Sequence, residues 1–72
     1  MRFFVFMRLI LNGENFETSK AGTVRELLDE LKIISGRVAV EVNLKILRKA
    51  DYETYKLSEG DKIEIVNFVG GG

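Results

Sequence analysis

A single stretch of the chain, residues 23–31, has the spacing of an amphipathic helix, so any sheet formed by the rest must be covered by this helix. Thr23 and Glu26 have the spacing of a capping box, in which each side chain satisfies a free backbone N–H at the helix start. We therefore expect a helix that starts at Thr23 and is ended by Ser35-Gly36. Its apolar residues recur at intervals of three and four, and so share one face: Val24, Leu27, Leu28 and Leu31.

The chain before this helix predicts a β-hairpin. Residues 2–11 are rich in aromatic and branched side chains, which favour a strand. Asn12-Gly13 follows them and is the strongest short hairpin motif, because both turn positions require a positive φ. Residues 14–19 are expected to form the returning strand, and residues 20–22 a loop.

The chain after the helix predicts three further strands. Residues 38–42 alternate with period two and place three valines on one face. Along the last strand, the same alternation should turn Ile63 and Ile65 toward the helix. The other expected elements are a turn at Asn43-Leu44-Lys45, a short strand at 46–47, an irregular segment at 48–59 anchored by Tyr52 and Leu57, a turn at 59–61 and a last strand at 62–69.

The expected order is two strands, one helix and three strands, which predicts an α+β fold with a mixed sheet packed on one helix. At 72 residues the chain is expected to form a single domain over residues 1–72, with a flexible glycine tail at residues 70–72. It contains no cysteine, so dense apolar packing has to stabilise this small core without a disulfide.

The composition excludes several classes of function. The absence of His and Cys removes the commonest general base, the strongest side-chain nucleophile, the usual soft-metal ligands and the ligands of an iron–sulfur cluster. Zero net charge favours neither nucleic acid nor an anionic membrane as a partner. No segment approaches the ~20 apolar residues of a membrane span, so we expect a cytoplasmic protein. We expect no metal site, and we interpret these carboxylates as solvated: Glu14, Glu17, Glu26, Asp29 and Glu30.

The chain ends in Phe68-Val69-Gly70-Gly71-Gly72, so a strong strand leads directly into glycines. Taken alone, such a run would be interpreted as a frayed end. Here it follows a set of motifs in a fixed order. These motifs are Leu11-Asn12-Gly13-Glu14, Thr23-Val24-Arg25-Glu26-Leu27-Leu28, Val38-Ala39-Val40-Glu41-Val42-Asn43, Ile46, Tyr52 and Leu57-x-Glu59-Gly60-Asp61-x-Ile63-Glu64-Ile65-Val66.

Together these motifs resemble the ubiquitin-like β-grasp sulfur carriers, and most closely the thiamine-pathway (ThiS-like) family, from Met7 onward. The resemblance implies a β-grasp fold in which the first and last strands pair centrally. There are two departures. Arg48-Lys49 stands where the family often has Pro-Arg, and residues 1–6 precede the usual start of the family.

The resemblance also implies that the protein is a carrier and not an enzyme, with the C-terminal carboxylate of Gly72 as its reactive group. A carboxylate with a pKa of about 3.3–3.7 is an anion and a poor electrophile at neutral pH. A ubiquitin-activating-type adenylyltransferase would therefore join it to AMP from ATP. Sulfur from a protein persulfide would replace AMP, and thiazole synthase would use the resulting thiocarboxylate. The carrier itself would bind no cofactor, because the partner uses the ATP.

Three alternatives share this fold. The small subunit of molybdopterin synthase has the same tail chemistry, although the short length and the run from Gly60 to Val66 favour the thiamine pathway. A ubiquitin-like modifier would join Gly72 to lysines, and a passive interaction domain would not use the tail.

Alternation along the last strand also predicts a docking surface. Glu64, Val66 and Phe68 should point away from the helix, which leaves two apolar groups exposed beside the tail. Alternatively, Phe68 folds over the sheet edge as local packing. Ile10 and Ala39, on neighbouring strands, could join this surface. The expected partner contacts are Gly70, Gly71, Val69, Phe68, Val66, Glu64 and Ile10.

Overall fold

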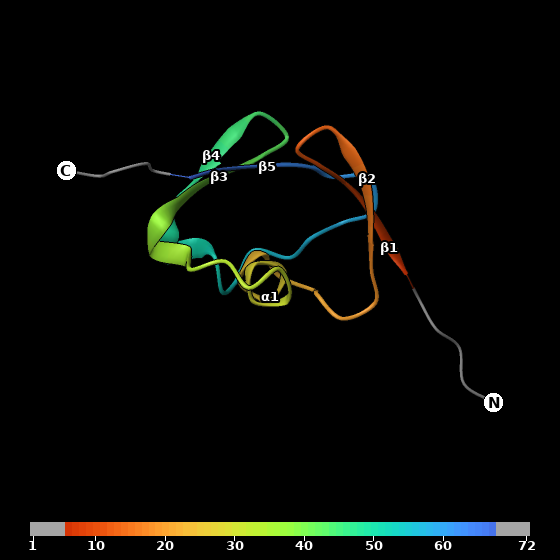
Figure 1. Cartoon of the computed structure of the whole chain (residues 1–72), viewed down its shortest axis with the longest axis horizontal. Helices are drawn as coiled ribbons and strands as arrows, with labels where there is room; N and C mark the ends of the chain where they lie inside the picture. Colours follow the sequence, from red (N-terminus) through yellow and green to blue (C-terminus); the bar gives the residue numbers. More distant parts are fainter. Residues whose placement is uncertain (1–5, 68–72) are drawn as a thin grey trace.

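The computed structural model describes residues 6–67, in which five strands form one mixed sheet with a single α-helix against it (Figure 1). The order of strands across the sheet is β2-β1-β5-β3-β4. The predicted α+β architecture is confirmed. The elements in chain order are β1 (Met7–Leu11), β2 (Glu14–Thr18), α1 (Val24–Glu30), a 3₁₀ turn (Ser35–Arg37), β3 (Val38–Val42), β4 (Lys45–Leu47), a second 3₁₀ turn (Lys49–Asp51) and β5 (Lys62–Asn67).

β5 occupies the centre of the sheet, between β1 and β3. It runs parallel to β1, with Leu11 opposite Ile63, and antiparallel to β3 along residues 63–67. Parallel strands cannot be joined by a tight hairpin, so the chain between β1 and β5 has to cross over the sheet, and α1 lies on this crossover. The expected central pairing of the first and last strands is confirmed.

Both hairpin turns contain asparagine with a positive φ. The β1–β2 turn is formed by Asn12 and Gly13, with φ of 49° and 83°. The β3–β4 turn is formed by Asn43 and Leu44, with φ of 52° and 72°. It is therefore a two-residue turn, and β4 begins at Lys45, which the sequence had assigned to the turn. A residue with a branched side chain, such as Leu44, rarely adopts this backbone conformation, so a turn as tight as this one is hard to predict from the sequence.

The core lies between α1 and the face of the sheet toward it (Figure 1). The predicted apolar face of the helix is buried, and Leu31, just past the helix, is partly buried against the same core. The three valines of β3, predicted to share one face, pack against it together with Leu9 of β1. The core cluster contains Leu9, Ala21, Val24, Leu27, Leu28, Val38, Val40, Val42, Tyr52, Leu57 and Ile63.

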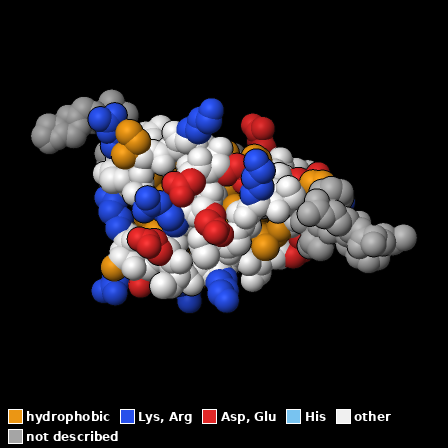
Figure 2. All heavy atoms as spheres, turned by 90° about the horizontal axis from the view of Figure 1, so that it is seen from below, with side chains coloured by type: hydrophobic (Ala, Val, Ile, Leu, Met, Phe, Trp, Pro, Cys, Tyr) orange, Lys and Arg blue, Asp and Glu red, His pale blue; other side chains and the backbone are white. Residues whose placement is uncertain are grey.

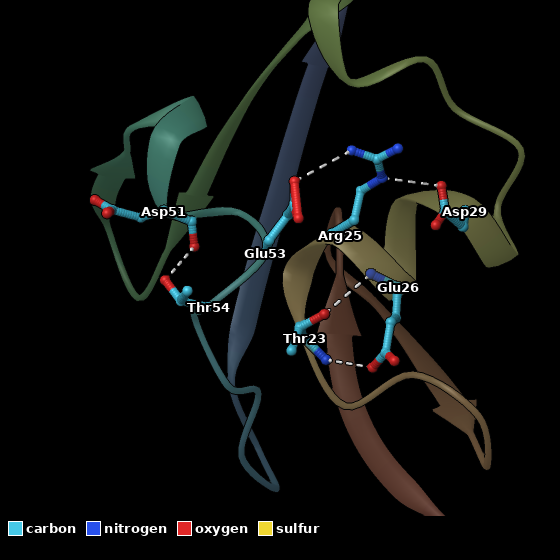
Figure 3. A network of polar contacts seen from close by, with 7 residues as sticks. All are labelled: Thr23, Arg25, Glu26, Asp29, Asp51, Glu53 and Thr54. Atoms are coloured by element: carbon cyan, nitrogen blue, oxygen red, sulfur yellow. Dashed lines mark hydrogen bonds and ion pairs between the residues drawn. The ribbon is translucent and has the colours of Figure 1, made fainter.

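α1 starts at the predicted capping box. The hydroxyl of Thr23 accepts the backbone N–H of Glu26 at 3.2 Å, and the Glu26 carboxylate accepts the N–H of Thr23 at 3.0 Å (Figure 3). The same carboxylate also accepts the N–H of Gly22 at 2.7 Å. The start of the helix is thus fixed by contacts within five residues of sequence.

The helix ends at Glu30, well before the Ser35-Gly36 pair that was expected to end it. The N–H of Ile33 donates to the carbonyl of Leu28 at 2.9 Å, and Lys32 adopts a φ of 60°. This arrangement is a Schellman motif, in which a left-handed residue closes the last turn. Glycine usually occupies that position, so a lysine there does not indicate the end of a helix.

The segment between β4 and β5, predicted to be irregular, is attached to the start of α1. The first N–H groups of a helix have no partner within the helix. Those of Val24 and Arg25 donate to the carbonyls of Tyr55 and Tyr52, at 3.1 and 2.9 Å. Arg25 also pairs with Glu53 at 4.0 Å (Figure 3), although so exposed a pair contributes little. This segment therefore supplies backbone acceptors that the helix itself lacks.

β1 begins at Met7, whereas the sequence predicted a strand over residues 2–11. Phe6 precedes the strand and is 58% exposed, and residues 2–5 lie outside the described residues. Met7 is opposite Thr18, the last residue of β2, after which the chain turns toward α1. Because β2 provides no partner beyond this point, pairing on that side ends at Met7. β2 itself ends one residue earlier than predicted.

The core predicts the effect of truncating the buried face of the helix. Leu28→Ala should lower the free energy of unfolding by roughly 2–5 kcal/mol, a large share of the stability of a small domain. Asp29→Ala is the matched control, since it removes only an exposed pair with Arg25 and should cost about 0.5 kcal/mol or less. Urea unfolding of both variants measures the difference. Equal midpoints would contradict the described packing of α1.

Tyr52, which is 3% exposed, predicts a change in stability at high pH. Burial raises the pKa of its phenol above the ordinary value of 10.0, and the Val40 backbone opposes part of this shift. The stability that the neutral phenol contributes is therefore present below about pH 10 and is lost as the pH rises through the folded-state pKa. The measurement is the difference in free energy of unfolding between wild type and Tyr52→Phe. It should fall above about pH 10, and a constant difference would contradict the prediction.

Candidate docking face of the sheet

The face of the sheet turned away from α1 is covered by no other element of residues 6–67 (Figure 1). The strand register shows which side chains lie on this face, because residues opposite each other share a face and neighbours along a strand point to alternate faces. We call it the open face. It carries Arg8, Ile10, Asn15, Glu17, Ala39, Glu41, Ile46, Lys62, Glu64 and Val66.

β5 has the orientation that the sequence predicted. Ile63 is fully buried toward α1, and Ile65 is partly buried against the same core. Glu64 and Val66 therefore point to the open face, where Val66 is 53% exposed. An apolar side chain thus remains in solvent near the end of the central strand.

Two more apolar side chains lie near Val66. Ala39 on β3 is directly opposite it, and Ile46 on β4, 75% exposed, lies one row away beside Glu41. Glu41 is also opposite Glu64, and like charges placed in this way destabilise a sheet. We call Ala39, Ile46 and Val66, with these two carboxylates, the apolar end of the open face.

Ile10 lies on the open face but not at the apolar end. It is half-buried and opposite Lys62, at the start of β5. Lys62 and Val66 are four residues apart along the strand, which corresponds to about 13 Å. The surface predicted from sequence is therefore divided: Val66, Glu64 and Ala39 lie together, and Ile10 is separate from them. Its neighbourhood is polar, with Arg8 and Glu17 paired at 3.2 Å.

Part of the predicted site falls outside residues 6–67. Phe68, Val69, Gly70 and Gly71 lie outside the described residues, as does Gly72, and so does the last part of the strand predicted over 62–69. The orientation expected for Phe68 and the flexibility expected for the tail therefore remain predictions. The described part of the site is the strand that leads to these residues and the surface around that strand.

Ile46 is the apolar residue of this surface that the sequence did not predict. Treating Asn43-Leu44-Lys45 as a three-residue turn left the register of β4 undefined. A two-residue turn at Asn43-Leu44 would have placed Ile46 opposite Glu41, and hence on the open face. Two consecutive residues with positive φ were the missing information.

The opposite side of the molecule has a different character. Acidic and basic side chains are interspersed over the surface on the α1 side (Figure 2). Within residues 6–67, no group of three or more His, Cys, Asp or Glu residues could hold a metal ion. No helix in this part of the chain is long and apolar enough to cross a membrane. The exposed apolar side chains of Val66 and Ile46 make the open face the candidate surface for a protein contact within residues 6–67.

A mixed sheet with one helix against one face and a central last strand defines the β-grasp, or ubiquitin-like, class of proteins. The sequence matches the ThiS family over residues 1–72. It is 42% identical over 65 residues to the sulfur carrier protein ThiS of Bacillus subtilis (strain 168), covering 89% of this chain and 98% of that protein. The chain therefore belongs to the ThiS family. The resemblance to this family that the sequence motifs indicated is confirmed.

A solved structure agrees with this assignment. The crystal structure of a thiamine biosynthesis protein (ThiS) from Geobacter metallireducens matches with a TM-score of 0.78 at 33% identity, covering 92% of this chain and 100% of that one. The chain is also 48% identical over 66 residues to a thiazole synthase of Paramagnetospirillum magneticum. That match covers 92% of this chain but only 20% of the thiazole synthase, so the chain spans about a fifth of that relative.

Proposed function

We propose that this carrier holds sulfur as a thiocarboxylate on Gly72 and delivers it to thiazole synthase. The observation that supports this most directly is the position of β5. This strand is hydrogen-bonded on both sides in the centre of the sheet, and the sequence continues from it into Phe68-Val69-Gly70-Gly71-Gly72. A partner that binds the sheet around β5 would therefore be placed beside the start of the segment that leads to the reactive end.

Loading of sulfur would pass through two activated forms of the Gly72 carboxyl group, an acyl-adenylate and then an acyl disulfide. The Gly72 carboxylate attacks the α-phosphate of ATP on an adenylyltransferase, pyrophosphate leaves, and an acyl-adenylate is formed. The terminal sulfur of a protein persulfide then attacks the acyl carbon and AMP leaves. A thiol cleaves the resulting acyl disulfide and is itself oxidised to a disulfide, which leaves the thiocarboxylate on the carrier.

Glycine suits the end of such a carrier for two reasons. It has no Cβ, so it fits a narrow channel and accepts backbone conformations that other residues avoid. Three residues also span about 10 Å when extended, enough to reach a reaction centre away from the sheet. Ordering them costs roughly 1–2 kcal/mol each, which the contact between the carrier and its partner has to offset.

The proposed recipient of the sulfur comes from the relatives. Two thiazole synthases, from Paramagnetospirillum magneticum and Magnetococcus marinus, each contain a segment similar to 92% of this chain, and it makes up 20% of their length. Joining two functions in one polypeptide keeps their local concentration high.

We propose that the apolar end of the open face is the main docking surface for these partners. Val66 and Ile46 expose apolar area beside two carboxylates, which suits a partner with apolar and basic side chains. The predicted contacts at Phe68, Val69, Gly70 and Gly71 would continue this surface toward Gly72. Ile10 would take part only if the partner also covers the start of β5.

The chemistry predicts a defined change in mass. Incubated with its cognate adenylyltransferase, ATP and a persulfide source, the protein should gain the mass of one exchange of oxygen for sulfur, measured by intact-protein mass spectrometry. Deleting Gly72 should abolish this gain. The variant should keep the urea midpoint of the wild type, because terminal residues contribute few buried contacts.

Other outcomes would assign other functions. Attachment of a whole second protein through Gly72 would favour a ubiquitin-like modifier. Sulfur transfer to a molybdopterin precursor, and none with thiazole synthase, would favour the small subunit of molybdopterin synthase. No change in mass with the cognate partner present would contradict the proposal.

The docking surface predicts a different effect from a single substitution. Val66→Asp should lower kcat/KM for adenylation by roughly tenfold or more, because a charge without a partner would be buried at the interface. Ile34→Asp is the matched control: Ile34 is 61% exposed but lies between α1 and β3, away from the open face. Equal losses in the two variants would argue against docking at the apolar end.

A further inference from the structure

The asparagines of the two hairpin turns both direct their side chains at the central strand. The Oδ1 atom of Asn12 accepts the backbone N–H of Ile65 at 2.8 Å. The Oδ1 atom of Asn43 accepts the backbone N–H of Lys62 at 3.0 Å. Each turn therefore holds β5 from one side, Asn43 at its start and Asn12 closer to its end.

Asn12 extends the parallel ladder beyond the end of β1. Its backbone N–H donates to the carbonyl of Ile63 at 2.8 Å, as the next residue of a regular strand would. In a regular parallel ladder, its backbone carbonyl would then accept the N–H of Ile65. The chain turns into the hairpin at Asn12, with φ of 49°, and the side-chain oxygen accepts this hydrogen bond instead.

This contact stands at the limit of pairing on one side of β5. β1 is paired with Lys62 and Ile63, whereas β3 is paired with β5 as far as Asn67. Within residues 6–67, the bond that the Ile65 N–H donates to Asn12 Oδ1 is the last hydrogen bond between β5 and the β1 side of the sheet. Val66 and the residues leading to the glycines follow immediately after it in the sequence.

We propose that Asn12 is a positioning residue for sulfur loading. β3 sets the register of the second half of β5 on one side, and the Asn12 side-chain oxygen secures Ile65 on the side that β1 leaves unpaired, so that Val66 meets the adenylyltransferase in one arrangement. This inference rests on the function proposed above. It adds a role for the Asn-Gly turn beyond the reversal of the chain.

The two asparagines allow a matched test. Asn12→Gly keeps a residue that accepts a positive φ but removes the acceptor for Ile65. Asn12→Asp keeps both a side-chain oxygen and tolerance of positive φ. Asn43→Gly removes the equivalent bond at the start of β5, and also the bond that the Asn43 amide donates to Asp61 at 3.0 Å. It should therefore destabilise the fold at least as much as Asn12→Gly does.

The experiment measures adenylation kinetics with the cognate adenylyltransferase, together with hydrogen exchange of the Ile65 amide. In Asn12→Gly the Ile65 amide should exchange faster, and KM for the carrier should rise about fivefold, the factor expected for loss of one neutral hydrogen bond, with little change in kcat. Asn12→Asp should return KM toward the wild-type value. Asn43→Gly should leave KM near wild type.

Three results would overturn the inference. If Asn43→Gly raises KM as much as Asn12→Gly, the effect is one of general stability. If Ile65 exchange accelerates in Asn12→Gly while KM is unchanged, the contact has no role in positioning. If Ile65 exchange is unaffected, the hydrogen bond does not hold the strand. A wild-type carrier that is not adenylated at all would instead contradict the proposed function, and this inference with it.

Discussion

The rest of this structure depends on the pairing of β5 between β1 and β3. Because β1 and β5 are parallel, the chain between them has to cross over, and this crossover puts α1 against one face of the sheet. The helix brings enough apolar surface to bury one face, and the chain has no second α-helix among the described residues to bury the other. One covered face and one open face are therefore consequences of a single strand pairing.

The division between the faces separates stability from recognition. Leu27, Leu28 and Ile63 are fully buried and supply the hydrophobic contribution to folding. Val66 and Ile46 contribute little to it, since both remain largely in solvent. Apolar residues in a chain this short would be expected in the core, so their exposure beside the end of β5 agrees with a surface that another protein covers.

The segment between β4 and β5 has little regular secondary structure and is held in place by polar contacts. It returns past the N-terminal end of α1, where the carbonyls of Tyr52 and Tyr55 accept hydrogen bonds from helix N–H groups. It then enters β5 through Asp61, whose carboxylate accepts the N–H of Ser58 at 2.8 Å and the side-chain amide of Asn43 at 3.0 Å. The start of the central strand is thus fixed by polar contacts as well as by its ladder.

The sequence by itself determined the elements whose causes are local. The capping box at Thr23 and Glu26, the Asn-Gly turn and the alternation along β3 and β5 each act within a few residues, so the helix start, the first hairpin and the inward face of β5 could be predicted. The resemblance to sulfur carriers also came from sequence, because it rests on motifs that occur in a fixed order.

Only the tertiary structure decided where several of the helices and strands begin and end. β1 begins where β2 can no longer pair with it. α1 ends at Glu30 and is closed by Lys32 in a left-handed conformation, for which lysine has no preference. It also decided that Ile46 lies near Val66 and that Ile10 does not. The two-residue turn at Asn43-Leu44 sets the register of β4, whereas the register of β5 against β1 and β3 depends on contacts distant in sequence that no short stretch of residues contains.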